Sequence, residues 1–124
     1  NAIAGGDTVF CSVYTPAGKL IQRWQYGMFN QPWGIVQAPS NFGLYSGAIL
    51  VGNTGSGWIG AYNASNGQFM DFLRDSTGQL ITIPGLWALS FGNGSAEAGP
   101  ANVLYFTAGG PNLTTGVFGS LSAN

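Results

Sequence analysis

The chain has 124 residues, the size of one ordinary domain, and only 6% of them are charged. A typical soluble domain is roughly 25% charged, so solubility here must depend on amides, hydroxyls, attached sugar or burial of surface in an assembly. With three basic residues in the whole chain, no basic stripe can neutralise a phosphate backbone, which argues against a nucleic-acid partner. The sequence also contains no apolar run of the roughly 18 residues that a membrane span requires, so no membrane span is expected.

The chain opens with residues 1–7, which end in two glycines and an aspartate and are expected to be a tail or linker. Apolar and polar residues then alternate across 8–27, interrupted by the turn residues 15–19. This pattern predicts a β-hairpin with strands at 8–14 and 20–26.

Residues 32–75 predict four short strands in a row. The segments between the strands are rich in glycine, asparagine and serine, which supply positive φ angles or side-chain bonds to the backbone. The predicted strands are Trp33–Gln37, Ala48–Gly52, Trp58–Tyr62 and Phe69–Leu73. Four antiparallel strands of this length form a blade, the unit from which β-propellers are built.

The first hairpin repeats the second half of this blade. Gly18 stands against Gly67 and Val13 stands against Tyr62, with the same separation along the chain in both cases. The hairpin therefore corresponds to the third and fourth strands of a blade whose first two strands are missing.

Residues 85–122 repeat the first half of the blade. Trp87 stands against Trp33 and Leu104 stands against Leu50, again with one shared separation along the chain. A further strand is predicted near the end of this segment, and no fourth strand follows it. The segment is therefore expected to be an incomplete blade.

These repeats predict an all-β fold, a partial β-propeller of four-stranded antiparallel blades with about 2 to 2.5 blades. The propeller segment spans 8–124, with a half blade at 8–27, a complete blade at 32–75 and an incomplete blade at 85–122. A β-sandwich of the same strands is the alternative fold.

Incomplete blades have consequences for partners, because a closed propeller needs at least about four blades. Outer blade faces would expose apolar side chains, and incomplete blades would carry open strand edges. We therefore expect the partners to be other copies of the chain or the missing remainder of the propeller.

The residues that could carry chemistry are few. The sequence contains no histidine, so neither a Ser-His-Asp triad nor a histidine metal site can be built. Asp71 and Asp75 are four residues apart, which on a strand is roughly 13 Å and too far for the carboxylate pair of a glycosidase. Asp75 is better explained as a turn residue that accepts bonds from backbone amides. We therefore expect no catalytic residue, no metal, no cofactor and no enzymatic activity.

Trp33 and Trp87 hold equivalent positions in the first strand of their blades, which borders the central channel of a propeller. Packing between blades is one interpretation. The other is an aromatic platform that stacks sugar rings or another small ligand. This second interpretation leads to an alternative function, a carbohydrate-binding, ligand-binding or hydrolytic propeller with its site in the central channel.

Three acceptor patterns for N-glycosylation lie in predicted turns, and they begin at Asn63, Asn93 and Asn112. In a chain this rich in asparagine, serine and threonine, such triplets also arise by chance.

Four motifs occur in order along the chain: Gln31–Ile35, Ser46–Asn53, Gly85–Leu89 and Ala101–Gly109. Together they resemble the C-terminal part of an uncharacterised family of secreted bacterial proteins with NHL-like β-propeller repeats, over roughly residues 5–121. The resemblance implies a propeller and export, and it implies no activity. The chain is much shorter than a full propeller, which leaves open whether it is a fragment, a cleavage product or a self-assembling piece.

The function expected from the sequence is a non-enzymatic, extracellular scaffold or interaction module. A more specific version is a repeating subunit of a surface fibre, since open edges at both ends would let head-to-tail association continue.

Overall fold

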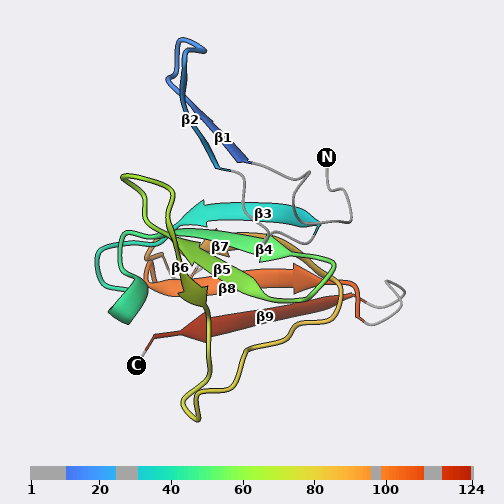
Figure 1. Cartoon of the computed structure of the whole chain (residues 1–124). Helices are drawn as coiled ribbons and strands as arrows, with labels where there is room; N and C mark the ends of the chain where they lie inside the picture. The colour runs from blue at the N-terminus through green and yellow to red at the C-terminus, as the bar shows by residue number, and fades with distance from the viewer. Residues whose placement is uncertain (1–10, 25–30, 96–98, 111–115, 124) are drawn as a thin grey trace.

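A computed structural model describes residues 11–24, 31–95, 99–110 and 116–123, which form an all-β fold (Figure 1). The predicted tail, residues 1–7, lies outside these residues. The strands are β1 (Cys11–Tyr14), β2 (Leu20–Trp24), β3 (Pro32–Gln37), β4 (Ile49–Asn53), β5 (Ile59–Tyr62), β6 (Phe69–Phe72), β7 (Leu86–Phe91), β8 (Val103–Ala108) and β9 (Val117–Ser122). A single turn of 3₁₀ helix, η2 (Gly43–Tyr45), lies between β3 and β4.

The described strands form three antiparallel sheets. Strands β3, β4, β5 and β6 form the first sheet in sequence order, β7, β8 and β9 form the second sheet, and β1 pairs with β2. The prediction of an all-β fold with antiparallel sheets is therefore confirmed. Within the described part of the chain the sheets form no closed ring.

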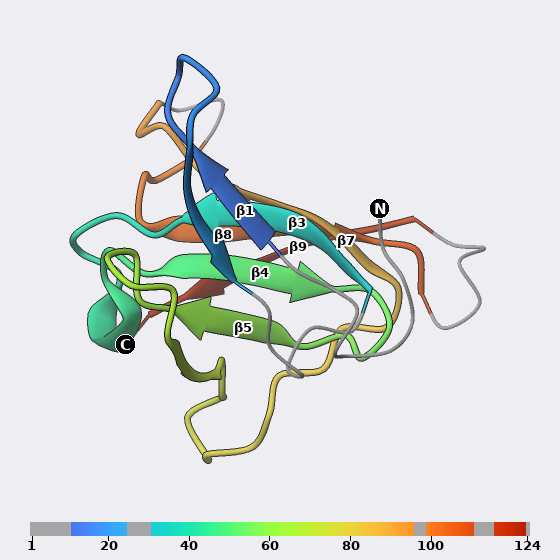
Figure 2. The ribbon, with the colours of Figure 1, turned by 45° about the horizontal axis from the view of Figure 1, so that its top comes forward.

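The first and second sheets lie face to face, with β3 and β4 packed against β7 (Figures 1 and 2). Strands β3 and β7 run in the same direction, and the β1–β2 hairpin extends away from both sheets. The buried residues between the sheets form one cluster: Ala38, Phe42, Ala48, Leu50, Ile59, Ala61, Leu73, Ile83, Leu86, Leu89, Leu104 and Ala108. Complete burial of an aliphatic side chain contributes about 1.5–3 kcal/mol, so this cluster is the main source of stability.

Two strand glycines allow the sheets to approach closely. A Cβ atom at Gly34 would lie 2.9 Å from the carbonyl oxygen of Trp87 and 3.0 Å from the amide nitrogen of Leu89. A Cβ atom at Gly52 would lie 3.1 Å from the side chain of Leu86. Because the contacts at Gly34 are with backbone atoms, which cannot rotate away, any side chain there must push β3 from β7.

The strand pairing corrects the alignment of the two blades. The sequence analysis matched their first and second strands with a single separation along the chain. Gln37 pairs with Ile49 in the first sheet, and its counterpart Phe91 pairs with Leu104 in the second. The separation along the chain between β4 and β8 is therefore one residue longer than the separation between β3 and β7. The counterpart of Leu50 is then Tyr105, and not Leu104.

The corrected alignment explains which way the side chains point. Leu50 and Leu104 are both fully buried in the cluster between the sheets, so they face each other. Tyr105, the true counterpart of Leu50, alternates with Leu104 along β8 and belongs to the opposite face. Equivalent residues of the two sheets thus point in the same direction. We call this arrangement stacking in one sense.

The β1–β2 hairpin has the same pairing pattern as β5–β6. Tyr14 pairs with Leu20 after a register shift, and Tyr62 pairs with Phe69 after a register shift at the corresponding place. This pairing changes the alignment of β1 with β5 by one residue. The counterpart of Tyr62 is Tyr14, and not Val13 as the sequence analysis predicted. In the second strands of the two hairpins, Leu20 is the counterpart of Phe69, which keeps the separation of Gly18 from Gly67.

Replacement of Gly34 by alanine tests the close approach of the sheets. We expect Gly34→Ala to lower the free energy of unfolding by about 1–3 kcal/mol, because the added methyl group overpacks a contact between two backbones. Gly116→Ala is the matched control, since a Cβ atom there would meet nothing within 4 Å. Chemical denaturation of both variants measures the difference, and equal stability of the two would contradict the proposed contact.

Candidate interaction site

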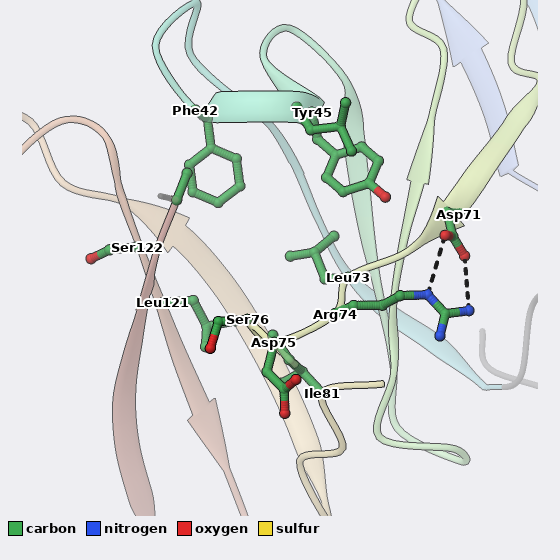
Figure 3. Close-up of a pocket in the computed structure, with 12 residues that line it drawn as sticks. Phe42, Tyr45, Asp71, Leu73, Arg74, Asp75, Ser76, Ile81, Leu121 and Ser122 are labelled. Atoms are coloured by element: carbon green, nitrogen blue, oxygen red, sulfur yellow. Dashed lines mark hydrogen bonds and ion pairs between the residues drawn. The ribbon is translucent and has the colours of Figure 1, made fainter. Parts of the chain in front are cut away.

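A groove of about 600 Å³ lies at the outer edges of the two stacked sheets. Three segments that are far apart in the sequence converge on it: η2 with its preceding residue, the chain that follows β6, and the end of β9 (Figure 3). The residues that line it are Phe42, Leu44, Tyr45, Asp71, Leu73, Arg74, Asp75, Ser76, Ile81, Leu121, Ser122 and Ala123.

The floor of the groove is apolar. Phe42 and Leu73 are buried in the cluster between the sheets, and Ile81 and Leu121 are partly buried against it. Phe42 is held in place by an edge-to-face contact with Phe91, with ring centroids 5.0 Å apart. A rigid floor of this kind can accept apolar side chains of a partner.

One rim of the groove carries an ion pair. The Arg74 guanidinium lies 3.2 Å from the Asp71 carboxylate (Figure 3). It also donates a hydrogen bond of 3.0 Å to the carbonyl of Gly78. Both charged side chains are roughly half exposed, so the pair contributes about 0–1 kcal/mol to stability. Burial raises the pKa of the Tyr45 hydroxyl, and the Asp71 carboxylate adds to that rise while Arg74 opposes it.

The Asp75 carboxylate organises the loop beside this rim. It accepts bonds from the Thr77 hydroxyl, from the Thr77 amide at 2.9 Å and from the Gln79 amide at 3.1 Å. These bonds stabilise the ionised carboxylate and lower its pKa, with the Thr77 hydroxyl as the largest cause. The turn predicted at this position is therefore present, and the ionised Asp75 carboxylate stabilises it.

We expect an NMR titration to show the pKa of Asp75 below its ordinary value, and Thr77→Val to raise it towards that value. Because the pKa of Asp75 is lowered in the folded chain, the carboxylate stabilises the turn fully at pH values above the ordinary aspartate pKa. This contribution is lost as the pH falls through the lowered pKa. Ser76→Ala is the control, because Ser76 makes no bond to Asp75 among the contacts described. A pKa that does not respond to Thr77→Val would refute the assignment.

The groove opens beside a strand edge. All six residues of β9 pair with β8, and no strand in the described ranges pairs with the other edge of β9. In the first sheet, the corresponding edge of β5 is covered by β6. The N–H and C=O groups along such an edge are a template for a further strand.

Trp33 and Trp87 lie together, away from the groove, at the start of β3 and β7. Their ring centroids are 5.4 Å apart with an interplanar angle of 67°, an edge-to-face contact between the sheets. The two residues are also 56% and 45% exposed. The pair therefore packs between sheets and still presents aromatic surface.

The other sequence-predicted sites are scattered. Asn63 and Asn93 are exposed, and each side-chain oxygen accepts a backbone amide in its own turn. Asn112 lies outside the described residues. Among the residues described, no group of three or more histidines, cysteines, aspartates or glutamates is placed to hold a metal ion. No helix in the described ranges has the length and hydropathy needed to cross a membrane.

Sequence reasoning missed most of the groove. Phe42 falls in a segment predicted only as a turn between two strands, and Leu121 falls in the strand predicted near the end of the incomplete blade. The available signal was the insertion of large apolar residues into segments otherwise built from turn residues, as in the run Phe42–Tyr45.

Comparison with known proteins finds relatives in Acanthamoeba polyphaga mimivirus. The chain is 31% identical to the uncharacterized protein L690 over 113 residues and 30% identical to the uncharacterized protein R648 over 122 residues, which is 90% and 98% of this chain and 29% of each relative. It is 40% identical to the uncharacterized protein R640 over 78 residues, 62% of this chain and 14% of that relative. The chain thus spans less than a third of the length of these relatives. No family model and no solved structure matches it.

The resemblance to a secreted bacterial family with NHL-like repeats is wrong. The relatives found are viral, and no family model of such repeats matches the chain. The motifs that suggested it are short strands followed by Gly/Asn turns, which any tightly connected antiparallel sheet requires. Such residues recur because tight hairpin turns need them, and they do not identify a family.

Proposed function

We propose that this chain is a non-enzymatic interaction module that associates through the open faces and edges of its sheets. The partners are further copies of the chain or other parts of a longer polypeptide. The proposal includes a propeller-like arrangement of stacked blades and an extracellular location, the latter supported by the low content of charged residues.

The stacking of the first sheet on the second is the observation that carries this proposal. Because equivalent residues of the two sheets point the same way, the outer face of the second sheet corresponds to the face that the first sheet uses for packing. A further sheet can pack there as the second packs on the first. Propeller blades are likewise stacked in one sense around their axis, and this likeness supports the propeller-like arrangement.

The chemistry of this outer face is suited to a protein partner. Tyr105 and Phe118 stack on it with ring centroids 5.6 Å apart, and Phe118 is 71% exposed. Strands β7, β8 and β9 contain no charged residue. Exposed aromatic residues with little charge nearby are typical of the centre of a protein interface.

The length of the relatives supports the same conclusion. The chain matches less than a third of each viral relative, so those proteins contain other sequence that can supply neighbouring sheets. Association between copies and completion by a longer polypeptide use the same faces.

Replacement of Phe118 by aspartate tests the proposal. We expect the wild-type chain to self-associate in sedimentation experiments, and Phe118→Asp to lower the association constant by on the order of tenfold or more, because the interface would bury an unpaired charge. Ala64→Asp, in an exposed turn of the first sheet, is the control with the same added charge. A well-folded wild-type chain that sediments only as a 12.8 kDa monomer at high concentration would refute association between copies.

The exposed pair Trp33 and Trp87 supports a second candidate function, the binding of carbohydrate. Sugar rings stack on exposed aromatic side chains, and two adjacent indoles offer more such surface than scattered residues do. The contact between β3 and β7 fixes their relative position.

A glycan array distinguishes this candidate. If the pair binds sugar, Trp33→Ala and Trp87→Ala should each abolish the signal, because each removes half of the aromatic surface. Phe118→Ala should leave the signal intact, since it removes an exposed aromatic residue from a different face. Binding that survives both tryptophan substitutions would count against the site.

A further inference from the structure

Two turns of the structure carry an exposed acceptor pattern for N-linked sugar. Residues 63–65 read Asn-Ala-Ser and lie in the turn between β5 and β6, and residues 93–95 read Asn-Gly-Ser and lie in the turn between β7 and β8. All six residues are exposed. An asparagine followed two positions later by serine or threonine, without proline between them, is the pattern that accepts N-linked sugar. The surface therefore presents both patterns to a modifying enzyme.

The backbone holds the two asparagine side chains in the same way. The side-chain oxygen of Asn63 accepts the amide of Ser65 at 2.8 Å, and that of Asn93 accepts the amide of Ser95 at 2.9 Å. Each bond fixes the carboxamide and brings the backbone of the serine beside it. In the contacts among described residues, neither side-chain nitrogen donates a hydrogen bond, so both nitrogens are available to react.

Other asparagines show that this state is not general. Asn53 is fully buried, and its side-chain nitrogen donates to two backbone carbonyls. Asn66 is exposed in the same turn as Asn63, and its side-chain oxygen accepts the amide of Gln68. It lacks the serine or threonine that the acceptor pattern requires two positions later. Asn66 is therefore a matched control for Asn63.

The two turns lie at the same end of the stacked sheets. Asn63 follows β5 and Asn93 follows β7. Strands β3 and β5 are both antiparallel to β4, and β7 runs in the same direction as β3, so all three run towards that end (Figure 1). Trp33 and Trp87 lie near the starts of β3 and β7, at the opposite end. Sugar on the two turns would thus leave the tryptophan pair uncovered.

The composition of the chain gives attached sugar a physical role. Only 6% of the residues are charged, and strands β7, β8 and β9 contain no charged residue. A protein with so little charge needs other hydrated groups to remain dispersed in water. N-linked sugar is bulky and solubilising, and on these turns it would add hydration at the ends of the sheets.

We propose that Asn63 and Asn93 are sites of N-linked glycosylation, with an oligosaccharide carried on a lipid diphosphate as the donor. The side-chain nitrogen of the asparagine bonds to the anomeric carbon of the first sugar and loses one proton. The bond from that carbon to the phosphate oxygen breaks, and the lipid diphosphate leaves. This inference rests on the extracellular location in the proposed function, because such donors act on chains that are being exported.

Secretion of the whole chain from eukaryotic cells tests this inference. Mass spectrometry should find a mass above the 12.8 kDa of the unmodified chain. An amidase that removes N-linked glycans should convert Asn63 and Asn93 to aspartate, which identifies the two positions in peptides. The deglycosylated chain should also be less soluble than the secreted one, because it loses the hydrated sugar.

Variants in the two turns make the test specific. Ser65→Ala should lose the glycan at Asn63 and keep the glycan at Asn93, because the acceptor pattern requires the hydroxyl. Ser95→Ala should have the reverse effect. Ser65→Thr retains a hydroxyl and should keep both glycans. The control Asn66→Gln changes an exposed asparagine outside the pattern and should also keep both.

The outcomes separate this inference from the proposed association. A folded, secreted chain with no glycan at either position would overturn the inference, and a glycan at only one position would overturn the assignment of the other. If the chain is unmodified and self-associates, only the glycosylation fails. If both glycans are present and the chain remains monomeric after their removal, association between copies fails and the glycosylation sites stand.

Discussion

The contact between β3 and β7 at Gly34 is the constraint on which the rest of the structure depends. Because position 34 has no side chain, the backbone of β3 lies directly on the backbone of β7 at Trp87 and Leu89. This contact allows the close spacing of the two sheets along β3 and β7, and the apolar cluster is buried between them.

Sheets stacked in one sense have two different faces. The face of the first sheet that packs on the second corresponds to the outer face of the second sheet, so the two surfaces in each contact differ. Association through these faces would therefore join unlike surfaces and would not close by a twofold axis. Because strands β7, β8 and β9 contain no charged residue, the proposed association through the outer face of the second sheet would depend on apolar burial and would respond little to salt.

The three sheets are variations of one unit. The first sheet has all four strands, the second has the first three, and the hairpin has the pattern of the last two, including the register shift before Tyr14 and Tyr62. The groove lies beside β9, at the place that β6 takes in the first sheet.

The sequence by itself determined the strands, the turns and the low charge. Alternating apolar residues and glycines with positive φ, as at Gly18 and Gly67, act within a few residues, so they can be recognised locally. The sequence also indicated the equivalence of Trp33 and Trp87, which the structure places in contact. It did not reveal the shifted alignment of the second strands, because one extra residue between two paired strands changes the facing of every later side chain without changing the alternation.

Only the tertiary structure decided where the groove lies and what forms it. Phe42, Leu73 and Leu121 are distant in sequence and meet because two sheets stack, and no local pattern encodes that meeting. Strand pairing and the stacking of the two sheets likewise decided that Leu50 and Leu104 are buried against each other. Local residue preferences act along the chain, whereas packing acts between segments that the chain brings together only when it folds.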